Sequence, residues 1–220
     1  VLASFETDFS DGEIPETAEL FGVAEIGPDE RDESDEPNEF LHVTDALNGQ
    51  NGSMKIQDIT DGRTFKEFEV GFRLYISDST CCGSTDDTSP AHRPADGWSL
   101  SIGNDLPDTI ALPEEGTGSG IRICFDTWDS GGGEAPAIDV WNGVEGEVGD
   151  GDQDAWSGGL FVRQKFDGVT AAKAEEKFTD PDTGEFVFMW THGEGVDFSL
   201  KVYAGRIVIN YKGYEMINEE

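Results

Sequence analysis

Hydrophobic and polar residues alternate with a period of two along most of this chain. The alternation is clearest at residues 66–76, 159–163, 197–203 and 206–211. Because successive side chains of a β-strand point to opposite faces of a sheet, this period predicts half-buried strands. Further strands are predicted at 20–26, 40–44, 121–125 and 186–190. Only residues 170–177 have a helix-forming composition, and that run is too short and too poorly capped to predict a stable helix.

Turn-forming residues separate the alternating runs. The chain has 28 glycines and 9 prolines, as the many turns of an all-β protein require. Its 220 residues suffice for one sandwich with a sizeable core. We therefore predict an all-β fold, a two-sheet antiparallel jelly-roll sandwich of about a dozen strands, with residues 1–220 as a single domain.

The charge of the chain is strongly negative. It has 47 acidic and 14 basic residues, a formal net charge of −33. Nucleic acid is excluded as a natural partner, because its phosphates require a cationic surface. The acidic surface suits a saline or calcium-rich exterior, or serves only solubility. The acidic run at 28–39 is interpreted as a solvated loop.

No apolar run approaches the roughly 20 residues that a membrane helix needs, so we predict no membrane span. The sequence shows no basic and apolar signal segment at its start. We expect a mature or excised domain of a longer exported protein, located outside the cell or on its surface.

A glycine-rich loop after the strand at 121–125 has the composition of a calcium site. Asp126 ends the strand, and the loop adds Asp129, Ser130 and Glu134 around three glycines. Calcium binds about six to eight hard oxygens, which converge where the intervening backbone turns tightly. An Ala-Asp-Gly-Trp turn lies about thirty residues upstream, at 95–98.

These two motifs together resemble the L-type (legume-like) lectins of the concanavalin A-like lectin/glucanase superfamily. The likeness spans roughly residues 1–217. It implies that Asp96, accompanied by Gly97, accepts hydrogen bonds from sugar hydroxyls. The calcium ligands that it implies are Asp126, the carbonyl of Trp128, Ser130 and Glu134.

The chain departs from the lectin pattern at several positions. Ser130 stands where the family has an Asn that binds both calcium and sugar, and Glu134 stands where it has an Asp. Cys124 and Trp141 stand where the family has an acid and a His of a neighbouring transition-metal site. We therefore expect calcium as the metal and no transition-metal site.

The same alignment argues against an enzyme. The related glucanases carry paired carboxylates at alternating positions of one strand, which flank the glycosidic bond. The matching positions here are Cys124, Asp126 and Trp128 or Asp129, so no pair of glutamates is formed. The three histidines lie in no recognisable catalytic triad motif: His42, His92 and His192.

Several residues keep more than one interpretation. Cys124 could form a disulfide with Cys81 or Cys82, or the two adjacent cysteines could bridge each other. Residues 149–154, with three aspartates at alternate positions, fit an accessory calcium site or an exposed turn. Residues 180–184 predict a hairpin turn, and 51–53 fit a glycosylation acceptor in a loop.

Sugar rings stack on exposed aromatic side chains, and four tryptophans beside glycine-rich turns are candidates for this contact: Trp98, Trp128, Trp141 and Trp156. We expect most of the four to lie in the core. Trp190 is assigned to the core. The leading functional hypothesis is a calcium-dependent, glycan-binding module with sugar contacts from Asp96, Gly97, Trp128 and Ser130. A structural or adhesive surface domain without sugar binding is the alternative, and a glycan-cleaving enzyme is the least favoured.

Overall fold

The computed structural model describes residues 3–29, 38–45, 47, 49–76, 96–108, 116–127, 136–142, 160–165, 189, 191 and 195–220. This part of the chain contains twelve strands and no helix. The strands are β1 (Ala18–Gly22), β2 (Glu25–Pro28), β3 (Glu39–His42), β4 (Gly52–Ile56), β5 (Phe68–Leu74), β6 (Gly97–Ile102), β7 (Ile121–Asp126), β8 (Ala137–Asn142), β9 (Leu160–Lys165), β10 (Val196–Tyr203), β11 (Arg206–Tyr211) and β12 (Tyr214–Glu219). The predicted all-β class is confirmed.

The chain divides into two units, each compact in itself. The larger unit comprises Lys66–Pro107 and Pro113–Glu220, and the smaller comprises Val1–Phe65 and Asp108–Leu112. In the smaller unit β1 pairs with β4 and β2 pairs with β3, both antiparallel. The expectation of a single domain over 1–220 stays a prediction.

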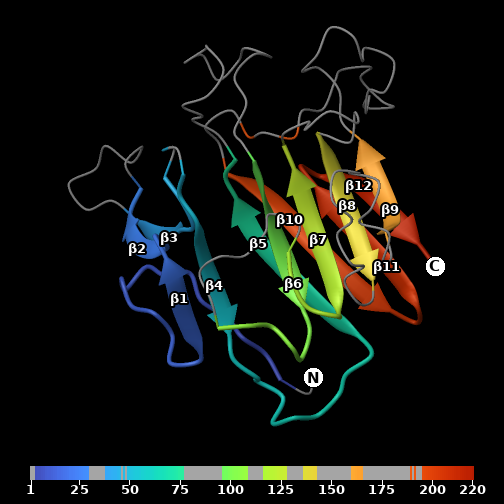
Figure 1. Cartoon of the computed structure of the whole chain (residues 1–220), viewed down its shortest axis with the longest axis horizontal. Coiled ribbons are helices and arrows are strands. Elements are labelled where there is room, and N and C mark those ends of the chain that lie inside the picture. Colours follow the sequence, from blue (N-terminus) through green and yellow to red (C-terminus); the bar gives the residue numbers. More distant parts are fainter. Residues whose placement is uncertain are drawn as a thin grey trace, which may run out of the picture. The chain divides into compact units, whose positions relative to one another are not determined.

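The larger unit is a sandwich of two antiparallel four-stranded sheets (Figure 1). The front sheet has the order β6-β7-β8-β9, and the back sheet has the order β12-β11-β10-β5. Each sheet sends alternate apolar side chains inward, as the period of two predicts. The jelly-roll prediction of two packed sheets therefore holds for this unit.

Aromatic rings join the two layers of the sandwich. Phe125 of β7 meets Phe198 of β10 edge to face, with ring centroids 5.6 Å apart. Phe198 in turn packs on Phe72 of β5 at 4.8 Å. Aromatic pairs in this geometry contribute about 0.5–1.5 kcal/mol beyond the area that they bury. They fix the two sheets against each other, so the ends of β6 and β7 are held on a rigid layer.

Two details of the strand prediction were wrong. The single strand expected at 20–26 is two strands, β1 and β2, separated after Gly22, whose φ is +70°. Gly52 and Ser53 lie on β4, paired with β1, rather than in a loop. The acidic run at 28–39 connects β2 to β3, with Pro28 opposite Glu39, and residues 30–37 lie outside the described residues.

Other predicted segments fall outside the described residues. These are the hairpin at 180–184, the helix-forming run at 170–177, the aspartate run at 149–154, and Trp190. Strands β4, β6, β8 and β12 lie where the sequence pattern predicted none.

Candidate functional site

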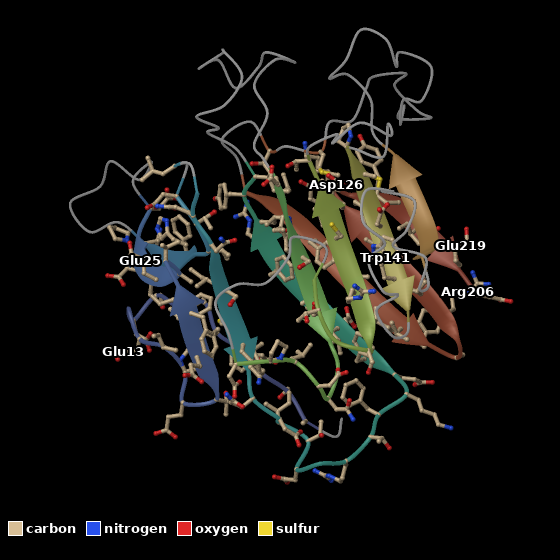
Figure 2. The ribbon with its side chains drawn as sticks, viewed as in Figure 1. Glu13, Glu25, Asp126, Trp141, Arg206 and Glu219 are labelled. Carbon is tan, nitrogen blue, oxygen red and sulfur yellow. The ribbon has the colours of Figure 1, made fainter. Side chains whose placement is uncertain are left out.

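The two lectin-like motifs meet at one end of the front sheet. Gly97 begins β6 and Asp126 ends β7, and the antiparallel register places these two residues directly opposite each other. Phe125 points into the core, so alternation along β7 directs the Asp126 side chain to the outer face of the sheet. Figure 2 shows Asp126 at this end of β7. The structure thus brings together two segments about thirty residues apart in sequence.

A pair of hydrogen bonds fastens the turn before β6 to the end of β7. The Thr127 amide donates to the Asp96 carbonyl at 3.0 Å, and the Thr127 hydroxyl donates to the same oxygen at 2.8 Å. Thr127 is only 2% exposed, whereas Asp96 is exposed. The backbone of Asp96 is therefore fixed while its carboxylate faces solvent.

Gly97 is required by a close backbone approach. A Cβ atom at this position would lie 2.3 Å from the carbonyl oxygen of Phe125. No side chain fits at that distance, because carbon and oxygen repel steeply there. The glycine lets β6 start tight against β7 and sets the position of Asp96.

Half of the predicted site lies in the described structure. Asp96, Gly97 and Asp126 are placed, whereas Trp128, Ser130 and Glu134 lie outside the described residues. Among the residues that are placed, no group of three His, Cys, Asp or Glu side chains could hold a metal ion. Asp126 places one carboxylate at the end of β7, where the sequence predicts the calcium loop to begin.

Two aromatic candidates for sugar stacking pack against the protein. The Trp98 ring stacks on Phe125 with centroids 4.6 Å apart and meets the edges of Phe72 and Phe198. Trp98 is half-buried and points toward the core because it alternates with Gly97 along β6. Trp141 is 5% exposed, on the outer face of β8 (Figure 2). Trp128 and Trp156 lie outside the described residues.

The outer face of β7 and β8 is buried as well as the inner one. Arg122 and Cys124 of β7 are each 1% exposed, and Asp139 of β8 is 3% exposed. Cys124 is present as a buried thiol, while Cys81 and Cys82 lie outside the described residues. Sequence reasoning missed Arg122, Asp139 and Thr127 as structural polar residues. For Arg122 the sequence had a signal, because the alternation Ile-Arg-Ile-Cys-Phe-Asp at 121–126 places it on the face away from the core.

The fold has a relative among solved structures. The crystal structure of the VIP36 exoplasmic/lumenal domain, in its calcium- and mannose-bound form, matches with a TM-score of 0.54 and 11% sequence identity. The match covers 92% of this chain and 69% of that one. At this identity the likeness shows the fold alone, a legume-like lectin sandwich. The sequence matches no protein-family model and no curated protein, and no helix in the described part is long and apolar enough to cross a membrane.

Proposed function

We propose that this chain is a calcium-dependent carbohydrate-binding module of an extracellular protein. The observation that carries the proposal is the junction of Asp96 and Gly97 with the end of β7. There the Thr127 hydrogen bonds hold an exposed carboxylate beside the first residue of the calcium loop. A fixed, exposed carboxylate at the end of a lectin-like sandwich supports the proposal of a shallow sugar site there.

Each placed residue has a defined role in this proposal. The Asp96 carboxylate accepts hydrogen bonds from two neighbouring sugar hydroxyls, each worth about 1.5–3 kcal/mol because the acceptor is ionised. Gly97 allows the approach of the two strands that positions Asp96. Trp128 and Ser130 complete the sugar contacts that we propose.

Calcium binding is proposed for Asp126, the Trp128 carbonyl, Ser130 and Glu134. Bound calcium holds the loop after β7 through its oxygen ligands. The loop in turn orients the neighbouring groups toward the sugar hydroxyls. The described ligand, Asp126, is a partly exposed carboxylate at a strand end, as a hard-oxygen site requires. The VIP36 domain was solved with calcium and mannose bound, which supports this assignment.

Isothermal titration calorimetry tests whether the chain binds calcium at the proposed site. Calcium titrated into chelator-treated protein should give one tight binding event above the weak background expected of a chain with 47 acids. Asp126→Ala should remove that event. Asp197→Ala is the matched control, because it deletes an exposed carboxylate on β10 and the same charge. Equal loss in both variants would show only diffuse attraction of cations.

A structural or adhesive domain is the second candidate. Ser130, where the lectins have an Asn, favours it because a hydroxyl replaces the amide that bridges metal and sugar. Calcium binding with no glycan bound on a broad array would favour this candidate. An enzyme is not proposed, since the fold relative is a lectin and the glucanase positions, Cys124, Asp126 and Trp128 or Asp129, hold no pair of glutamates.

A further inference from the structure

A buried guanidinium lies on the outer face of the front sheet. Arg122 is 1% exposed, and its Nε and Nη1 atoms are buried with no hydrogen-bond partner among the described residues. Its neighbours along β7, Ile123 and Ile121, belong to or pack on the core, so Arg122 points away from it. This arginine plays no part in the proposed sugar site.

The side chains beside Arg122 are arranged to receive a negative group. In the sheet register Arg122 lies between Ser101 of β6 and Trp141 of β8. Its Cζ atom lies 5.6 Å from the centroid of the Trp141 ring, a cation–π contact. Ser101 Oγ accepts a bond from the Thr117 amide at 3.0 Å, so its hydroxyl hydrogen is left to donate elsewhere.

Charge balance at Arg122 is incomplete within the described structure. The ion pairs between described residues do not include Arg122. Asp139, the buried acid of the same face, lies opposite Cys124 in the strand register, one pair along from Arg122. Burying an ionised group is costly unless an opposite charge lies close, and water satisfies its hydrogen bonds without balancing its charge.

We propose that Arg122 binds a small inorganic anion of the halide class, which is chloride in ordinary salt solution. Ser101 donates a second hydrogen bond, and the Trp141 ring packs against the guanidinium. Arg122, Cys124, Asp139 and Trp141 are all at most 5% exposed, so we expect only a monoatomic anion to reach the guanidinium. A sugar would need a pocket of about 300 Å³ or more. The site is independent of the proposed glycan site and serves stability.

Bromide diffraction gives the direct test. Crystals of the full chain grown in sodium bromide should show an anomalous peak within hydrogen-bonding distance of Arg122 Nε or Nη1. Absence of that peak, or a carboxylate of the chain on either nitrogen, would overturn the proposal.

Anion-dependent melting gives a second readout that needs no crystal. At one ionic strength, wild type should melt higher in sodium chloride than in sodium gluconate, and the melting temperature should rise with the logarithm of chloride concentration. Gluconate is too large to enter a site this well shielded. Equal melting temperatures in the two salts contradict the proposal.

Two arginine variants show whether the effect of chloride on the melting temperature depends on Arg122. Arg122→Met should melt below wild type in chloride and at or above it in gluconate, because it removes both the anion site and an uncompensated buried charge. Arg73→Met is the matched control, since Arg73 is 69% exposed on β5 and its loss changes net charge equally. The control should keep the full chloride response. A variant Arg122→Met that is more stable than wild type in both salts would mark Arg122 as a structural residue without an anion.

Discussion

Gly97→Ala tests whether close strand contact fixes the candidate site. The new Cβ atom would lie 2.3 Å from the Phe125 carbonyl oxygen, about 1 Å short of ordinary contact at 3.4 Å. The neighbouring atom is backbone in the middle of a sheet, so it cannot rotate away. Forcing such an overlap into a packed region costs about 1–3 kcal/mol.

A second glycine provides the matched control. Gly71 lies in β5, where a Cβ atom would meet only the Phe198 carbonyl oxygen at 3.7 Å. Gly71→Ala should therefore be neutral or stabilising by about 0.4–1 kcal/mol, since alanine restricts the unfolded chain. Both variants replace a strand glycine by alanine, so their difference reports the close approach at Gly97 together with its φ of +158°.

Urea unfolding followed by tryptophan fluorescence measures this difference. We expect Gly97→Ala to lie about 1.5–4 kcal/mol below Gly71→Ala in the free energy of unfolding, at an unchanged m value. The Thr127 amide should also lose protection from hydrogen exchange, because its bond to Asp96 depends on the same approach. Equal stability of the two variants would refute the reasoning.

Further predictions concern single groups and salt. Thr127→Val should cost about 1 kcal/mol in urea unfolding, because it deletes the hydroxyl bond to Asp96 and keeps the shape. Tyr211→Phe should cost about 1–3 kcal/mol, because the buried phenol donates to the Met189 carbonyl; no loss would show that water replaces this bond. Burial lowers the pKa of Lys212 to about 8, so Lys212 should make stability rise with pH between about 8 and the unfolded value near 10.5. NMR of the labelled lysine side chain checks this, and a pKa near 10.5 would contradict it. Raising salt from about 0.1 to 1 M, in chloride or gluconate, should raise the melting temperature because it screens a net charge of −33; an unchanged value would show that self-repulsion is small.

The sequence predicted the strands in which apolar and polar residues alternate most regularly, and it missed strands in which this contrast is weak. In β5 and β10 the apolar residues alternate with exposed charges, and both were predicted. The outer face of β8 is buried, so Asp139 and Trp141 break the contrast between its two sides. The break after β1 had a signal in Gly22, where a Cβ atom would lie 2.1 Å from the Asn51 carbonyl oxygen.

The turn between β11 and β12 was missed for a local reason. Lys212 and Gly213 both adopt positive φ, at 55° and 84°, which reverses the chain tightly. Asn and Gly are the residues typical of such turns, and a lysine does not indicate one. The strand that follows was therefore not predicted.

The candidate site was predicted as two motifs, and the structure adds how they are joined. The motifs named Asp96, Gly97 and Asp126, but not Thr127, whose two bonds fasten the turn. Those bonds depend on the register of β6 and β7, and register is a property of paired strands rather than of either motif.

Glycan binding by wild type and Asp96→Asn tests the central claim most directly. An array of diverse glycans should be probed with the purified chain in calcium, in chelator, and with Asp96→Asn in calcium. The account predicts a ligand in calcium alone, lost in chelator and bound at least about tenfold more weakly by Asp96→Asn, which corresponds to about 1.4 kcal/mol. A ligand bound equally well by the variant or in chelator would contradict it, and so would the absence of any ligand while calcium still binds.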